Sequence, residues 1–77
     1  MSAEQATAFK NEGNKAFLES RFQDAVDAFT KAIEINPNDN VFYSNRSGAY
    51  ASMNKLDEAL EDAVKCIQLK PDWAKGY

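Results

Sequence analysis

The stretch that decides the fold is FQDAVDAFTKAIEINP, residues 22–37. Its small and apolar residues have the spacing of one helix face, and they are Phe22, Ala25, Val26, Phe29, Ala32 and Ile33. The same pattern returns 34 residues later in LDEALEDAVKCIQLKP, residues 56–71. Because a fixed period of this length is the signature of stacked helical units, we expect a repeat protein.

The period extends beyond these two stretches. A shift of 34 residues aligns identical residues at Asn11 and Asn45, Ala25 and Ala59, Lys31 and Lys65, Ile33 and Ile67, Pro37 and Pro71, and Tyr43 and Tyr77. An aromatic residue also recurs at this step, at Phe9, Tyr43 and Tyr77. We therefore divide the chain into a first repeat at 6–39, a second at 40–73 and the start of a third at 74–77.

Each unit is predicted to contain two helices. They are expected from Ser2 to about Ser20, from Phe22 to Ile35, from Asp39 to Met53 and from Leu56 to Leu69, with a fifth starting near Asp72. Ser2 and Gln5 have the spacing of a capping box, and Pro37 and Pro71 each end a helix. The predicted fold is all-α, with helix-turn-helix repeats stacked into a short right-handed solenoid.

The helical spacing also predicts which side chains face inward. In the first helix these are Ala6, Phe9, Gly13, Ala16 and Phe17, and in the third they are Tyr43, Tyr50 and Met53. A glycine inside a helix costs about 1 kcal/mol relative to alanine. We therefore expect the next helix to cross Gly13 too closely for a side chain. Cys66 takes the small core position that Ala32 fills one period earlier, which indicates a packing role.

Composition excludes several classes of function. The 77 residues carry a net charge of −3, which argues against a nucleic-acid partner. No apolar run approaches the ~20 residues of a membrane span. The single cysteine excludes an internal disulfide and favours a reducing, cytoplasmic setting. There is no histidine, and Asp57, Glu58, Glu61 and Asp62 are interpreted as an exposed helix face, so we expect no metal, cofactor or catalysis.

The repeat resembles the tetratricopeptide-repeat (TPR) family. That family places a small residue, an aromatic residue, a second small residue and a proline at set positions in a 34-residue unit. The first repeat supplies them as Ala25, Phe29, Ala32 and Pro37, and the second as Ala59, Ala63, Cys66 and Pro71. The second repeat departs from the family pattern, since Ser47 replaces the usual glycine and Ala63 the usual aromatic residue.

A narrower resemblance is carried by KNEGN at 10–14, YSNRS at 43–47 and PDWAKGY at 71–77. These stretches resemble the carboxylate-clamp co-chaperone TPR domains, most of all the first TPR domain of the heat-shock organising proteins. The resemblance implies an adaptor that binds the Glu-Glu-Val-Asp tail of a heat-shock chaperone. It favours the 70-kDa chaperone over the 90-kDa one as partner.

The same resemblance assigns the clamp to Lys10, Asn14, Asn45 and Lys75. The family's fifth member, an arginine, would fall two residues beyond Tyr77. Lys10 and Asn14 are one helical turn apart and share a face beside the core stripe. Since first helices line the concave side of such arrays, all four residues are expected there. Phe17, Ser44 and Gly48 are further candidates for lining the groove.

Some alternatives remain open at this point. Arg46 could reach the groove or pair with a neighbouring acid. The domain could be the targeting module of a multidomain enzyme, since phosphatases, prolyl isomerases and ubiquitin ligases carry similar clamps. It could also be a self-associating scaffold without carboxylate preference, because two repeats leave apolar surface uncovered around Tyr50, Leu60 and Ile67.

Overall fold

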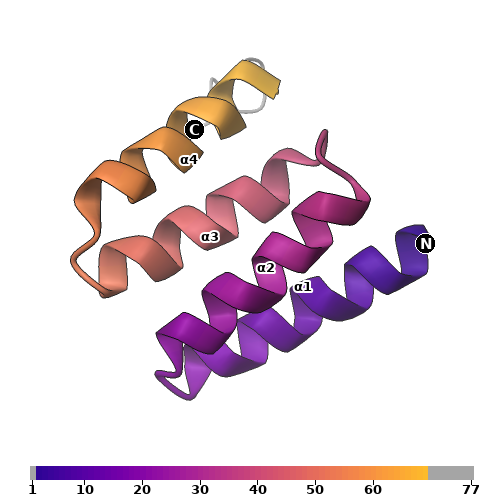
Figure 1. Ribbon diagram of the computed structural model, residues 1–77, viewed down its shortest axis with the longest axis horizontal. Helices are drawn as coiled ribbons and strands as arrows, with labels where there is room; N and C mark the ends of the chain where they lie inside the picture. Colours follow the sequence, from indigo (N-terminus) through magenta and orange to yellow (C-terminus); the bar gives the residue numbers. More distant parts are fainter. Residues whose placement is uncertain (1, 70–77) are drawn as a thin grey trace.

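The computed structural model describes residues 2–69, and these residues form four α-helices (Figure 1). The helices are α1 (Ala3–Leu18), α2 (Phe22–Ile35), α3 (Asn40–Ser52) and α4 (Leu56–Leu69). The four predicted helices are confirmed, and their ends differ from those observed by at most two residues. The described residues contain no strand, so the all-α class is also confirmed. The predicted fifth helix near Asp72 lies outside the described part of the chain.

The helices form two antiparallel hairpins that stack in chain order. α1 packs along α2, and α3 packs along α4 (Figure 1). The hairpins meet mainly through α2 and α3, and α1 also touches α3. Each hairpin is one helix-turn-helix unit, as the 34-residue period predicts.

The period extends to the backbone of the turns. Ser20 has a φ of 63° and Asn54 a φ of 61°, and both are the left-handed residue that ends a first helix. In each turn the N–H of the following residue donates to a carbonyl five residues earlier, at 2.8 Å and 2.9 Å. This is the hydrogen bond of a Schellman motif. The two hairpins therefore close by the same local mechanism.

The core consists of two clusters of mostly small side chains from α1, α2 and α3. One contains Ala16, Ala25, Val26, Phe29 and Ala49, with Phe17, Tyr50 and Met53 packed against it. The other contains Ala6, Ala32 and Phe42, with Phe9, Ile33 and Ile35 packed against it. The predicted inward residues are confirmed, as is the buried packing position of Cys66. The prediction missed Phe42, which is buried because α3 has neighbours on more than one side.

Gly13 marks the closest approach of α1 to α2. A Cβ built on Gly13 would lie less than 3.0 Å from three atoms of the Phe29 ring. Phe29 is 1% exposed, so a side chain at residue 13 would force its ring to shift within the core. The predicted reason for this glycine, a close helix crossing, is therefore confirmed.

The outer face of α4 exposes a stripe of aliphatic side chains, formed by Leu56, Leu60, Val64 and Ile67. Leu60 is 64% exposed, whereas Val26, its counterpart one period earlier, is 5% exposed. The expectation of uncovered apolar surface is confirmed for Leu60 and Ile67. Tyr50 is half-buried, because part of its side chain packs against the cluster that contains Val26 and Phe29.

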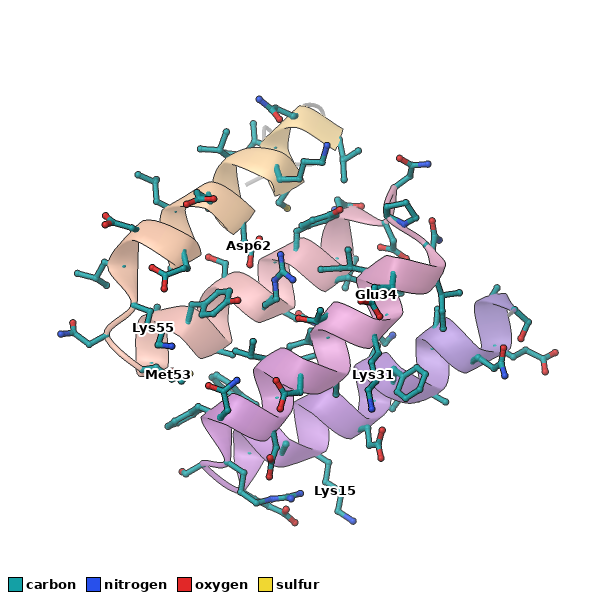
Figure 2. The ribbon with its side chains drawn as sticks, in the orientation of Figure 1. Lys15, Lys31, Glu34, Met53, Lys55 and Asp62 are labelled. Carbon is teal, nitrogen blue, oxygen red and sulfur yellow. The ribbon has the colours of Figure 1, made fainter. Side chains whose placement is uncertain are left out.

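An ion pair between half-buried Arg46 and buried Asp62 joins α3 to α4. The guanidinium of Arg46 binds the carboxylate of Asp62 with two bonds, Nε to Oδ2 at 2.7 Å and Nη2 to Oδ1 at 2.8 Å. Nη1 donates to Oγ1 of Thr30 on α2 at 3.1 Å. The guanidinium also lies 5.9 Å from the ring centroid of Tyr43 and 5.7 Å from that of Tyr50. One side chain thus connects three helices, and Figure 2 shows Asp62 directed from α4 toward α3.

The environment of Arg46 answers one open question and corrects one prediction. Arg46 pairs with an acid, and its hydrogen bond to Asp62 raises the pKa of the guanidinium although burial acts in the opposite direction. Asp57, Glu58 and Glu61 are exposed as predicted. The prediction that Asp62 is exposed is wrong, because this carboxylate turns inward to meet Arg46 and the residue is only 5% exposed.

We predict that Gly13→Ala destabilises the protein. The added methyl group would overlap the Phe29 ring, and overpacking of this kind costs roughly 1–3 kcal/mol. Gly48→Ala is the matched control, because a Cβ at Gly48 has no neighbour within 4 Å. The control should gain about 0.5–1 kcal/mol from helix propensity. Urea unfolding followed by circular dichroism measures both, and equal stabilisation by the two variants would contradict the close-crossing argument.

Breaking the Arg46–Asp62 pair should cost more than any surface substitution. Asp62→Ala leaves the half-buried guanidinium of Arg46 without its partner, and the loss should approach the ~3–5 kcal/mol that breaking a fully buried pair costs. Asp57→Ala, an exposed acid on the same helix, serves as control and should change the free energy of unfolding by less than about 0.5 kcal/mol. Replacing both partners with apolar residues, as in Arg46→Met with Asp62→Leu, should restore much of the loss. Similar urea midpoints for Asp62→Ala and Asp57→Ala would refute this role.

Candidate peptide-binding groove

A pocket of about 180 Å³ lies where α1 and α3 face each other over α2. Its lining residues are Asn14 and Phe17 from α1, Phe29 from α2, and Ser44, Asn45 and Gly48 from α3. Five of the seven predicted site residues are therefore brought together in one place. Phe29 was missed as a lining residue, although its contact with Gly13, beside Asn14, places it under the same part of α1.

The walls of the pocket combine two chemistries. Phe29 is almost fully buried and Phe17 is half-buried, so aromatic carbon forms the inner wall. Asn14 is exposed and Asn45 is half-buried, and neither amide forms a side-chain hydrogen bond with any residue in the described range 2–69. The pocket therefore offers uncommitted amide donors beside an apolar wall.

Of the two lysines predicted for the clamp, only Lys10 lies within the described residues. Lys10 is half-buried on α1, one turn before Asn14, and does not line the 180 Å³ pocket itself. Within residues 2–69 its ammonium makes no ion pair. Lys75 lies outside the described residues. Arg46 follows Asn45 in the chain but is not among the lining residues, because its guanidinium is held by Asp62.

Two larger hollows on the surface are less suited to the predicted binding role. One, of about 300 Å³, lies between α1 and α2 and includes Arg21, Asp24 and Asp27. Part of its charge is engaged, since Arg21 pairs with Asp24 at 3.1 Å and Asp27 accepts from Gln23 at 3.0 Å, and Glu12 and Lys31 also line it. The other, of about 520 Å³, lies along the exposed aliphatic stripe of α4. Of these three hollows, the pocket between α1 and α3 is the one that brings together five of the predicted site residues.

The remaining cations of the first repeat are directed elsewhere. Lys31 Nζ lies 5.5 Å from the ring centroid of Phe9, a cation–π contact between α2 and α1. Figure 2 shows Lys31 beside that ring and Lys15 extending away from the helices. Acidic side chains such as Asp24 and Asp27 belong to α2. The surface acids of the second helices thus do not neutralise the pocket between the first helices.

The described residues show neither a cluster of metal ligands nor a membrane-spanning helix. No group of three or more His, Cys, Asp or Glu side chains between residues 2 and 69 is arranged to hold a metal ion. In the same part of the chain, no helix has both the length and the apolar character needed to cross a membrane.

Comparison with known sequences gives a consistent result. The family model described as Tetratricopeptide repeat matches residues 6–39, and a second model of that description matches residues 42–72. The Hsp70-Hsp90 organising protein of Plasmodium falciparum is 49% identical over 77 residues, which is 100% of this chain and 31% of that protein. The chain thus spans less than a third of the length of the relatives it matches.

Comparison with solved structures supports the same family. The first TPR of Spaghetti (RPAP3), bound to the HSP90 peptide SRMEEVD, has a TM-score of 0.91 and 28% identity over 97% of this chain and 60% of that one. The TPR2B-domain:pHsp70-complex of yeast Sti1 has a TM-score of 0.87 and 35% identity over 88% of this chain and 54% of that one. With its four helices and its 34-residue period, the chain belongs to the tetratricopeptide-repeat family.

Proposed function

We propose that the pocket between α1 and α3 binds the free C-terminus of an acidic peptide tail carried by a heat-shock chaperone. The observation that carries this proposal is the pair of uncommitted amides, Asn14 and Asn45, on facing helices of one pocket. Lys10, one turn from Asn14, and Lys75 would complete the set of donors. The protein then acts as a non-enzymatic adaptor in the cytoplasm.

The chemistry of the donors suits a chain terminus that ends in aspartate. Such a residue carries two carboxylates, one on the backbone and one on the side chain, and both accept hydrogen bonds only. Lysine ammonium groups and asparagine amides donate, and each bond to a charged acceptor contributes about 1.5–3 kcal/mol. A neutral terminus cannot use these donors equally well. Recognition should therefore depend on the free carboxylate more than on any other group.

The solved relatives support the choice of partner. The first TPR of Spaghetti is bound to a peptide ending in Glu-Glu-Val-Asp, and the Sti1 domain is in a complex with an Hsp70 peptide. We infer a chaperone tail of this class for the present chain. Resemblance to the first domain of the organising proteins favours the tail of the 70-kDa chaperone over that of the 90-kDa chaperone. Titration with both tails in parallel decides between them.

The central prediction concerns the terminal carboxylate. A peptide ending in Glu-Glu-Val-Asp should bind at least tenfold more tightly as the free acid than as the C-terminal amide. Asn14→Ala, Asn45→Ala and Lys10→Ala should each weaken binding of the free acid roughly tenfold, since one charge-assisted bond is lost. Fluorescence anisotropy with a labelled peptide measures these affinities.

Matched controls lie on the same helix. Asn11→Ala removes an exposed amide that does not line the pocket, and Lys15→Ala removes a cation directed away from it. Both should bind the free acid within about twofold of the original chain. Equal affinity for free and amidated peptides would rule out a carboxylate clamp.

A second candidate function, self-association, is favoured by the exposed aliphatic stripe of α4. In the first repeat the equivalent face of α2 is covered by α3, which buries Val26. We propose that in solutions of the 77-residue chain a second copy covers Leu60, Val64 and Ile67. Both functions can coexist, because this stripe and the pocket between α1 and α3 share no residue.

If the chain self-associates, its average molecular mass in solution should rise with protein concentration. In sedimentation velocity the original chain should form dimers or larger species as its concentration rises. Leu60→Lys should shift the population to monomer, because it places a charge on the apolar contact. Leu18→Lys is the control, since Leu18 is an exposed aliphatic residue at the far end of α1 and should leave assembly unchanged. A monomeric original chain at high concentration would eliminate this function.

A further inference from the structure

The exposed aliphatic stripe of α4 is matched by no other described helix face. Of the six large apolar side chains exposed within residues 2–69, four form this stripe, and Leu18 on α1 and Val41 on α3 are the other two. A head-to-tail stack would place the stripe against α1, whose exposed side chains apart from Leu18 are small or polar. The surface that fits the stripe best is therefore the same stripe on a second copy. A contact of one surface with itself has a two-fold axis and closes at two chains.

A column of polar side chains runs beside the stripe. Each of its members follows a stripe residue by one position, and all are exposed: Asp57, Glu61, Lys65 and Gln68. Because residues three or four apart lie above one another on a helix, the column is parallel to the stripe along α4. Neither Glu61 nor Lys65 forms an ion pair with any residue between 2 and 69. The described neighbours therefore leave both charges available to a partner.

The order of charges along this polar column favours one orientation of two α4 helices. In an antiparallel pair, Leu60 of one copy can lie opposite Val64 of the second copy. The same register places Glu61 of each copy beside Lys65 of the other, so both contacts join opposite charges. In a parallel pair, each charge would face the same charge of the second copy. Since flanking charges determine the orientation of paired helices, the antiparallel arrangement is favoured.

A hollow of about 520 Å³ lies along the stripe and the polar column. Its lining combines apolar and charged side chains from α4 with one ring from α3, and the residues are Tyr43, Leu60, Glu61, Asp62, Val64, Lys65 and Gln68. Apolar side chains of a second α4 can enter this hollow while the flanking charges pair beside it. Burial of the stripe and pairing of the charges thus require the same placement of the second copy.

We infer that two copies of this chain associate through an antiparallel, two-fold contact between their α4 helices, in which Glu61 of each copy pairs with Lys65 of the other. This inference rests on the self-association proposed above, and it adds the orientation, the register and the limit of two copies. The hollow along α4 shares no residue with the pocket between α1 and α3. Each dimer therefore keeps both peptide pockets.

Charge reversal tests this orientation in the 77-residue chain. In Glu61→Lys both contacts become cation against cation, and in Lys65→Glu both become anion against anion. Each variant alone should dimerise about tenfold more weakly, because two surface ion pairs are replaced by two repulsions. An equimolar mixture of the two variants should recover the original affinity, since each chain then meets a partner of opposite charge. Sedimentation velocity over a concentration series measures the affinities, and the original chain should form no species larger than a dimer.

Matched controls reverse the same charges outside the polar column. Glu58→Lys lies on α4 and Lys15→Glu on α1, and both residues are exposed. Alone or mixed, these variants should dimerise within about twofold of the original chain, because a single exposed charge contributes little. Recovery in the mixture of Glu61→Lys and Lys65→Glu also excludes misfolding as the cause of the loss, since neither variant has changed.

The possible results separate the inference from the proposals on which it builds. Weaker dimers for each single reversal, with recovery in the mixture, support the antiparallel contact. Dimers that the single reversals leave unchanged overturn it while self-association stands, and species larger than a dimer overturn it in favour of head-to-tail stacking. A monomer at every concentration removes self-association and this inference together. Titration with the chaperone tail peptide is independent of these results, because the variants leave the pocket between α1 and α3 intact.

Discussion

The ion pair between Arg46 and Asp62 holds the two helices of the second repeat together, and the further bond from Arg46 to Thr30 connects that repeat to α2 of the first. Two charges withdrawn from water destabilise a protein unless their geometry is close and their remaining donors are satisfied. Here the bonds are 2.7 Å and 2.8 Å long, and a third donor of Arg46 is used by Thr30. Because these contacts come from α2, α3 and α4, they allow few relative positions of the helices.

The close approach of α1 to α2 determines the shape of the candidate site. Small residues dominate both core clusters, so the helix axes can approach closely. Phe29 fits beneath Gly13 and then forms part of the pocket wall. Packing in the first repeat thereby supplies the apolar surface beside which Asn14 and Asn45 present their amides. The groove is a consequence of how the repeats stack, and a single repeat could not form it.

Charge is distributed unequally between the first helices (α1 and α3) and the second helices (α2 and α4) of the repeats. On the surface of α2, Asp24 pairs with Arg21 and Asp27 accepts a hydrogen bond from Gln23. On α4, Asp62 turns inward and pairs with Arg46. The first helices hold the uncommitted amides and Lys10. An acidic protein can in this way present a surface suited to an acidic ligand, because charge complementarity is decided locally.

The sequence by itself determined the number of helices, their ends and the inward face of α1. These features depend on local chemistry: the 3.6-residue spacing of small and apolar side chains, the capping box at Ser2, and the proline after α2. It also placed Asn14 and Asn45 on first helices, so most of the candidate pocket could be predicted. Only the tertiary structure decided that Asp62 is buried and that Arg46 turns from the groove. The physical reason is that helical periodicity describes one stripe per helix, whereas α3 packs against several neighbours and buries residues on more than one side.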